Sequence, residues 1–276
     1  IVAENAVPGA YQQICMSLPS RAIRLRSTGD VISVLQGTNG DGDGDDSTVI
    51  SSRASAAGSD NNASLSGRTG VALWNSGILL TRLLDGIGVT NRSFLENKTV
   101  LELGCGTGMA SIAAHKLGAG KVIATDGNDE VVQLAKRNLE RNNLNISGGN
   151  DNEATMLQWG ALNAIDYYQE ADIVMGSDLT YNSANWGILA ETFDTILKPD
   201  GMVLYLTLGH SGFAVEGELG GFLTTVQSMG SLEYIKEDGA MMERLLNASL
   251  SDDEKRVIQG TGGFKVAVFK KKKRRR

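Results

Sequence analysis

The sequence predicts an α/β fold in which a mostly parallel β-sheet is covered by helices on both faces. From residue 100 onward, short aliphatic segments that suit buried strands alternate with segments whose apolar residues recur at helical spacing. Such alternation places a helix between successive strands, as in a parallel sheet. A turn from Gly104 to Gly108 joins the first of these strands to a helix, and its glycines allow the backbone to approach a ligand closely.

The hydrophobic pattern assigns the remaining elements in order. Helix 109–117 is rich in Ala and is followed by Gly118, a residue that suits a helix C-terminus. Helix 184–197 is expected to stop because of Pro199. The other predicted helices span 77–84, 128–142 and 217–229. The predicted strands are 100–103, 121–126, 154–159, 172–177, 202–208, 232–236 and 264–269.

The first 69 residues form two segments of different character. Residues 1–36 contain alternating apolar and basic residues followed by a Ser-Thr-Gly-Asp turn at 27–30, which predicts a small N-terminal β extension. Residues 37–69 are rich in Gly, Asp and Ser and carry few large apolar side chains. We expect this second segment to be a disordered linker, because it buries too little surface to offset the entropy of ordering.

The composition is that of a soluble globular protein. The 276 residues suffice for a large buried core, and no segment approaches the roughly 18 apolar residues needed to cross a bilayer. Residues 1–20 show no secretory signal. Cys15 and Cys105 are expected to be free thiols in a reducing, cytoplasmic compartment. With only His115 and His210 besides them, we expect no metal site, and we expect a monomer.

The net charge of −6 is unevenly distributed, because residues 270–276 are all Lys or Arg. The rest of the chain is therefore acidic, which argues against a nucleic-acid-binding surface. The basic tail, assigned to residues 271–276, has three interpretations: a nuclear-import signal, a contact to RNA or phosphate, and a solubilising end. The nucleus is thus a second expected location beside the cytoplasm.

The glycine turn favours one class of ligand. Its spacing is G-x-G-x-G, whereas a dinucleotide site has G-x-G-x-x-G with the last glycine on the helix. Glu102 stands in the strand before the turn, and a buried carboxylate needs a partner, such as the ammonium group of a ligand. Asp126 follows about 20 residues later, the usual place for a carboxylate that binds ribose hydroxyls. An amino-acid end plus a ribose describes S-adenosylmethionine (SAM) better than the alternative, NAD.

A second group of polar residues follows strand 172–177, at the same edge of the predicted sheet. Asp178 and Tyr181 are three residues apart, so their side chains would face the same way if this segment formed a helical turn. The structural alternative is that Asp178 caps the next helix and Tyr181 packs beside it. The spacing alone favours the structural alternative.

Residues 70–270 resemble the seven-strand SAM-dependent methyltransferases, and more closely their protein-lysine methyltransferase branch, methyltransferase family 16. The glycine motif marks only the superfamily. The narrower resemblance depends on Trp74, on Trp159 with Gly160, and on the D-x-x-Y motif of Asp178 and Tyr181. It implies a Rossmann-like sheet of seven strands with helices on both faces, and an antiparallel hairpin as the last pair of strands.

The same resemblance implies SAM as the methyl donor and a lysine side chain of a protein as the acceptor. Glu102 would lie near the methionine ammonium group, Asp126 would bind the ribose, and Trp159 would lie beside the adenine. Asp178 and Tyr181 would be the catalytic residues, at the mouth where the amine enters. The other residues implied to cradle SAM or line its pocket are Trp74, Gly104, Cys105, Gly106 and Ser177.

Other functions stay open at this point. The first is a nucleic-acid methyltransferase of the same fold. Such enzymes that modify adenine N6 have Asn/Asp-Pro-Pro-Tyr/Phe after the corresponding strand, and Leu179 and Thr180 replace those prolines here. The acceptor could instead be a protein histidine or a small molecule. A SAM-binding scaffold without turnover is the alternative from another class.

Overall fold

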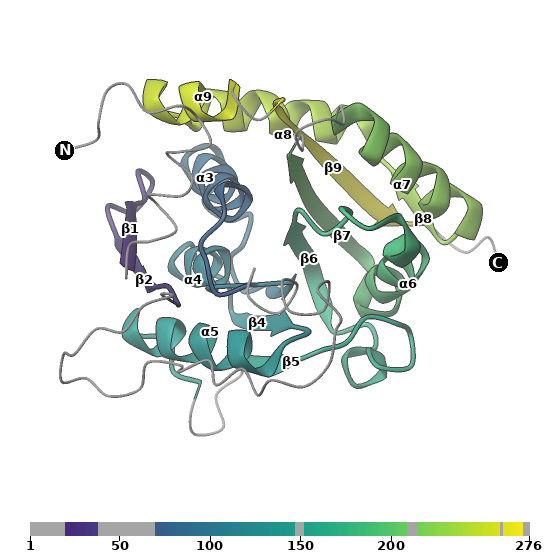
Figure 1. Ribbon diagram of the computed structural model, residues 1–276, viewed down its shortest axis with the longest axis horizontal. Helices are drawn as coiled ribbons and strands as arrows, with labels where there is room; N and C mark the ends of the chain where they lie inside the picture. The colour runs from purple at the N-terminus through teal and green to yellow at the C-terminus, as the bar shows by residue number, and fades with distance from the viewer. Residues whose placement is uncertain (1–19, 38–69, 147–151, 209–214, 260–261, 273–276) are drawn as a thin grey trace, which may run out of the picture.

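The computed structural model describes residues 20–37, 70–146, 152–208, 215–259 and 262–272 (Figure 1). The predicted linker lies outside these residues except for Gly37, and so do Cys15, His210 and the basic residues 273–276. A seven-stranded sheet lies between layers of helices, with a two-stranded sheet beside it. The small sheet pairs β1 (Ser20–Arg24) with β2 (Val31–Leu35) in antiparallel fashion, which confirms the predicted N-terminal β addition.

The large sheet has the strand order β5-β4-β3-β6-β7-β9-β8. The first five strands in that order are parallel, and β9 is antiparallel to both of its neighbours. The last two strands, β8 and β9, are antiparallel as the resemblance implied, but they are not a hairpin, because two helices lie between them in the chain. The order reverses between β3 and β6, and ligands of such sheets bind outside the carboxyl ends of the strands at this point. The strands are β3 (Thr99–Leu103), β4 (Lys121–Asp126), β5 (Glu153–Met156), β6 (Ala171–Ser177), β7 (Leu197–Leu208), β8 (Leu232–Tyr234) and β9 (Phe264–Lys271).

Helices cover both faces of the sheet, as predicted. On one face, α3 (Asn75–Thr90), α4 (Met109–Lys116), α5 (Asp129–Arg141) and α8 (Lys236–Ser249) share a core with the N-terminal hairpin. On the other face, α6 (Trp186–Ile196) and α7 (Val215–Met229) pack on a second core. Alternate residues of a strand serve the two cores, so Leu204 and Leu206 of β7 face the first, whereas Val203 and Tyr205 face the second.

The segment around Pro199 differs from the prediction. A short 3₁₀ helix, η2 (Ser183–Asn185), precedes α6, and α6 ends at Ile196 without need of the proline. The chain then enters β7 directly, five residues earlier than predicted. Pro199 is tolerated in this strand because the pairing of β6 with β7 is interrupted between Leu197 and Met202, so its missing N–H breaks no ladder there.

Two helices near the C-terminus were not predicted: α8 and α9 (Asp252–Gln259). A capping box in the sequence could have revealed α9. Ser251 Oγ accepts a hydrogen bond from Glu254 N at 3.2 Å, and the Glu254 carboxylate accepts one from Ser251 N at 2.8 Å. For α8 the signals were two acids in its first turn and the helical spacing of the buried residues Met242 and Leu246.

Three further observations bear on the expectations from composition. None of the helices in the described ranges is long and apolar enough to cross a bilayer. Within those ranges, no three His, Cys, Asp or Glu side chains lie together in a way that could hold a metal ion. Cys105 is a buried free thiol, and burial raises its pKa well above the usual value for cysteine.

Candidate functional site

The turn between β3 and α4, residues 104–108, is called the donor loop below. Gly104, Gly106 and Gly108 have φ angles of 62°, 52° and 77°, a region that L-residues other than Gly seldom adopt. Gly106 also lies close to another backbone, since a Cβ atom there would stand 3.2 Å from the carbonyl oxygen of Gly70. Gly108 is the N-cap of α4 without a side-chain cap, so the helix begins with backbone N–H groups directed at this edge.

Glu102 is buried in β3 and finds its partner within the chain. Ser111 of α4 donates to the Glu102 carboxylate from its backbone N at 2.9 Å and from its hydroxyl. Burial nevertheless raises the pKa of Glu102 to about 8, while the bonds from Ser111 lower it only in part. The carboxylate therefore has a neutral hydrogen-bond partner, Ser111, whereas we had expected it to depend on a ligand for one. Its role toward the ammonium group of a ligand stays a prediction.

Asp126 ends β4 and is hydrogen-bonded to the donor loop. Its Oδ2 accepts from Gly106 N at 3.2 Å, and its Oδ1 accepts from Asn128 N at 3.1 Å. Burial raises the pKa of this carboxyl group, and hydrogen bonds from backbone N–H groups act against the increase. The structure thus brings Asp126 to the glycine turn, as the spacing predicted, and its role toward a ribose stays a prediction.

The loop after β5 carries Trp159, which is half-buried against the core of α6 and α7. β5 ends at Met156, so Trp159 lies in this loop and not in the strand as predicted. Leu157 N donates to Asp126 O at 3.0 Å, and the Gln158 side chain donates to Gly127 O at 2.6 Å. Gln158 therefore ties this loop to the end of β4.

Trp74 is the half-buried N-cap of α3, and the segment before it is held by the N-terminal hairpin. Gly37 N donates to Val71 O at 3.0 Å, and Leu73 N donates to the Gln36 side chain at 2.7 Å. Because Gly70 touches the donor loop, the hairpin supports one wall of the site. This support from residues 20–37 was not predicted from the sequence.

Asn138 of α5 and Asn142, the residue that follows this helix, bind the free edge of β2. Asn138 accepts from Leu35 N at 2.7 Å and donates to Leu35 O at 3.1 Å, while Asn142 makes the same pair of bonds to Ser33 at 3.1 and 2.7 Å. Each amide thus replaces a strand partner for one residue of the edge. Asn138 makes one further bond, to Thr107 O in the donor loop at 2.9 Å. The hairpin is in this way joined to the donor loop through a single side chain.

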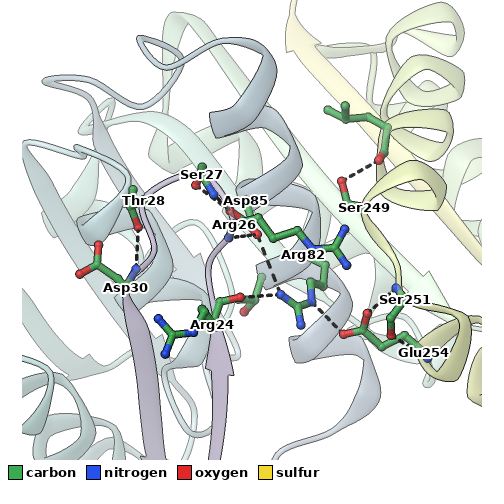
Figure 2. Close-up of polar contacts among 12 residues, drawn as sticks. Arg24, Arg26, Ser27, Thr28, Asp30, Arg82, Asp85, Ser249, Ser251 and Glu254 are labelled. Atoms are coloured by element: carbon green, nitrogen blue, oxygen red, sulfur yellow. Dashed lines mark hydrogen bonds and ion pairs between the residues drawn. The ribbon is translucent and has the colours of Figure 1, made fainter.

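The turn of the hairpin is held at its other end by Asp85 of α3 (Figure 2). This carboxylate is 1% exposed and accepts from Arg26 N at 2.8 Å, from Ser27 N at 2.9 Å and from the Ser27 hydroxyl at 2.6 Å. Arg82, one turn earlier, donates to Arg24 O and to Glu254 of α9, both at 2.8 Å (Figure 2). These bonds fix the hairpin to α3, and Arg82 also links α3 to α9.

Residues 178–181, which follow β6, are called the acceptor loop below. Asp178 has φ of +61°, Asp178 N donates to Leu206 O at 2.8 Å, and Asp178 Oδ1 accepts from Leu208 N at 3.2 Å. The loop is not helical, and Asn182, not Asp178, caps the next helix, so both predicted local geometries are wrong. Ser177 is half-buried at the end of β6, and the Tyr181 side chain is 67% exposed.

The donor and acceptor loops lie side by side because they follow neighbouring parallel strands. Leu103 of β3 pairs with Gly176 of β6, so both strands end at the same level. Leu179 fills the space between the loops: its Cδ2 lies 2.5 Å from the position that a Cβ atom on Gly104 would take. A side chain at residue 104 would displace Leu179, so the two loops are packed as one unit.

Sequence reasoning missed Tyr205 of β7, which is fully buried and bonded to the acceptor loop. Its hydroxyl oxygen lies 2.9 Å from Leu179 N and 3.1 Å from Thr180 N. A hydroxyl group within an otherwise apolar central strand must find a partner, and this was the signal available in the sequence.

The chain is similar to known methyltransferases. Protein-lysine N-methyltransferase EFM3 of Chaetomium thermophilum is 29% identical over 204 residues, 71% of this chain and 56% of that protein. Methyltransferase-like protein 23 of Dictyostelium discoideum is 31% identical over 151 residues, 50% of this chain and 59% of that protein. A solved TehB-like SAM-dependent methyltransferase from Corynebacterium glutamicum gives a TM-score of 0.47 at 19% identity, covering 76% of this chain and 93% of that chain.

This chain spans between half and two thirds of the length of the two relatives. Its residues 61–211, more than half of the chain, match the lysine methyltransferase family. That match includes the donor loop, Asp126, Trp159 and the acceptor loop, which are the parts on which the predicted resemblance depended. The resemblance is confirmed, and the chain belongs to the lysine methyltransferase family.

Proposed function

We propose that the protein transfers a methyl group from SAM to a lysine side chain of a protein substrate. The observation that carries the proposal is the packing of the donor loop against the acceptor loop through Leu179 and Gly104. It places a glycine turn suited to a cofactor next to the D-x-x-Y motif, on neighbouring strands of the sheet. The family match supports both the donor and the acceptor.

The residues at this edge fit SAM in chemical character. The donor loop offers backbone N–H groups at the start of α4, and Asp126 offers a carboxylate for ribose hydroxyls. Glu102 can balance an ammonium group by losing its proton, and Trp159 offers a flat face to an adenine. Trp74, Cys105 and Ser177 complete the proposed cofactor residues.

When bound, SAM supplies a methyl group on a positively charged sulfur, already activated for transfer. The task of the chain is then to align the acceptor amine and to exclude water. A lysine amine reacts only when neutral, and with an ordinary pKa of about 10.4 only about one in 2,500 is neutral at pH 7. Desolvation at the mouth of the site would lower that pKa.

Asp178 is proposed to capture and orient the ammonium form of the acceptor lysine. A carboxylate favours the charged form of a nearby lysine, so proton loss is assigned to water and not to Asp178. Tyr181, with its exposed ring and hydroxyl group, is proposed to form one wall of the entrance.

The test combines binding with an unbiased search for the acceptor. Calorimetry with SAM and with NAD measures which of the two binds, and radiolabelled SAM is then incubated with the protein and a cell lysate. Mass spectrometry of the labelled bands identifies the modified residue, and methyl-lysine is the expected product. Label on histidine, nucleic acid or a small molecule would overturn the proposed acceptor. SAM binding without label transfer would favour a scaffold, and preferential binding of NAD would overturn the donor.

A further inference from the structure

Thr180 of the acceptor loop is bound by β7, α6 and α7. Its backbone N lies 3.1 Å from the Tyr205 hydroxyl oxygen of β7, and its own hydroxyl lies 2.9 Å from the same oxygen. Its carbonyl oxygen accepts from the Trp186 indole of α6 at 2.8 Å. Its hydroxyl also donates to the carboxylate of Glu218 in α7. Thr180 is 1% exposed, so these bonds are made away from water.

The direction of these hydrogen bonds follows from the chemistry of the groups. The Thr180 hydroxyl donates its proton to a carboxylate oxygen of Glu218. The Thr180 oxygen then accepts from the Tyr205 hydroxyl, whose own oxygen accepts from Leu179 N and Thr180 N. Burial raises the pKa of Tyr205, so its hydroxyl keeps the proton that this arrangement requires.

We propose that Tyr205 is a positioning residue: its buried hydroxyl holds the acceptor loop in the shape that presents Asp178 and Tyr181 to the acceptor. The expected effect of Tyr205 on kcat rests on the proposed methyl transfer. Its expected effect on the order of the loop depends only on the hydrogen bonds described above. Tyr205 itself points into the core of α6 and α7 and is kept from the substrate by the loop that it supports.

The loop needs such support because its first residue has a positive φ. Asp tolerates a φ of +61° better than most residues other than Gly, but the conformation is uncommon, and it persists only where the surroundings enforce it. Without the Tyr205 hydroxyl, two buried N–H groups of the loop lose their acceptor. Asp178 is attached to β7 next to these residues, so a shift of the loop moves its carboxylate, and a displacement of about 1 Å can cost roughly a hundredfold in rate.

The test compares Tyr205→Phe with Tyr234→Phe. Each substitution removes one hydroxyl group from a tyrosine whose ring packs in the same aromatic cluster. Tyr205 contacts Phe222, and Tyr234 contacts Phe269, which itself contacts Phe222. Tyr234, however, lies on β8 and not beside the loop. Amide hydrogen exchange at Leu179 and Thr180 reports the order of the loop without any need for turnover. SAM affinity by calorimetry, and kcat and KM with the acceptor found for the wild type, report the function.

We expect Tyr205→Phe to speed exchange at both amides about tenfold, corresponding to the loss of one or two hydrogen bonds. It should lower kcat about tenfold or more while SAM affinity stays within about twofold of the wild type. Tyr234→Phe should change each of these quantities by less than about twofold. Unchanged exchange in Tyr205→Phe, or faster exchange with full kcat, would overturn the inference.

Substitutions at Thr180 give a second, independent measurement. Thr180→Ser keeps the hydroxyl and should retain kcat, whereas the isosteric Thr180→Val removes it and should lower kcat with SAM affinity unchanged. Equal rates in the two variants would overturn the role of the hydrogen-bond chain. A wild-type chain that transfers no methyl group would refute the proposed function, and the exchange data would still decide whether Tyr205 orders the loop.

Discussion

The donor loop and the acceptor loop follow neighbouring strands, but they are held in their shapes by different means. The donor loop takes its shape from its own sequence, because glycine supplies each positive φ angle at residues 104, 106 and 108. The acceptor loop contains no glycine. Asp178 is held at φ of +61° by hydrogen bonds from its backbone N and to its carboxylate, both with β7. Tyr205, Trp186 and Glu218 hold the residues after it.

The two loops differ in which residues of the chain determine their conformation. A loop shaped by glycines is specified locally and tolerates change in distant elements. A loop shaped by remote side chains depends on β7, α6 and α7 at once, so a substitution in any of these three elements can alter its shape. The proposed cofactor side is therefore the locally specified half of the site, and the proposed substrate side is the half that other elements can adjust.

The largest expected effect is at the acceptor loop. We expect Asp178→Ala to lower methyl transfer by about a hundredfold or more while SAM affinity stays within about twofold. The substitution removes the proposed lysine-binding carboxylate and also the acceptor of Leu208 N. Rates with labelled SAM and calorimetry with unlabelled SAM check the two expectations. Unchanged turnover would refute the assignment of Asp178.

Asp178→Asn separates the two functions of this side chain. Asn tolerates positive φ and its amide oxygen still accepts from Leu208 N, so the loop should keep its shape. If the negative charge captures the acceptor lysine, KM for the protein substrate rises in Asp178→Asn although the loop is intact. If Asp178 only anchors the loop, this variant keeps wild-type kinetics.

The second expectation concerns the local strain of the donor loop. Gly106→Ala places a Cβ atom 3.2 Å from Gly70 O at a φ angle of +52°, which costs about 1–2 kcal/mol. We expect the free loop to relieve this strain by moving away from Gly70. SAM binding must then return the loop to its strained shape, so SAM affinity should fall by up to about thirtyfold. Gly230→Ala is the matched control, because Gly230 has φ of +76° with nothing within 4 Å of its Cβ position. Calorimetry should show unchanged SAM affinity in the control.

The same contrast explains what sequence reasoning achieved. The donor loop, Asp126 and the strand–helix alternation were predictable, because each depends on a local pattern of glycines, acids or apolar residues. Asp178 and Tyr181 were found only through the resemblance, and their expected helical turn is wrong because β7 imposes another backbone shape. Tyr205 escaped notice because its partners are 25 and 26 residues away in the chain.

The helices show the same limit. Helix α5 was predicted over nearly its true extent, since Asn128 at its start and the apolar spacing within it are local signals. β7 begins five residues earlier than predicted, because the interrupted pairing with β6 accommodates Pro199, and no local pattern announces such an interruption. The hairpin was recognised as β structure, but its attachment through Asn138 and Asp85 depends on contacts across the fold.

The third expectation uses the buried acid beneath the donor loop. The pKa of Glu102 is about 8 in the folded protein and about 4.5 when unperturbed, so the folded state binds more protons between these pH values. The free energy of unfolding should therefore fall as pH rises from about 5 to 8, by at most about 1.4 kcal/mol per pH unit from this group. The raised pKa of Asp126 acts in the same direction.

Urea unfolding at a series of pH values checks this expectation. Glu102→Gln keeps an acceptor for Ser111 but does not titrate, so its unfolding free energy should change less with pH than that of the wild type. Equal pH dependence in the two proteins would show that Glu102 titrates normally. Calorimetry in buffers of different ionisation enthalpy adds a test of the ligand: if the SAM ammonium group lies near Glu102, binding at pH 7 releases a proton from it.

The smallest expected effect tests how far the donor loop is independent of the rest of the fold. Asn138 and Asn142 make equivalent bonds to the edge of β2, but only Asn138 also binds Thr107 O. Each Ala substitution should lower the free energy of unfolding by about 1–3 kcal/mol, because it leaves buried backbone groups without partners. Only Asn138→Ala should also weaken SAM binding, by about threefold, the share of one neutral hydrogen bond.

The comparison of the two variants separates local from remote support. Equal SAM affinities would mean that the glycines alone hold the donor loop, as its sequence suggests. Equal losses in both variants would mean that the hairpin as a whole, through Gln36 and the segment before Trp74, supports the cofactor side. A loss in Asn138→Ala alone would mean that even the locally specified loop depends on one side chain from α5, and the contrast between the loops would then be one of degree.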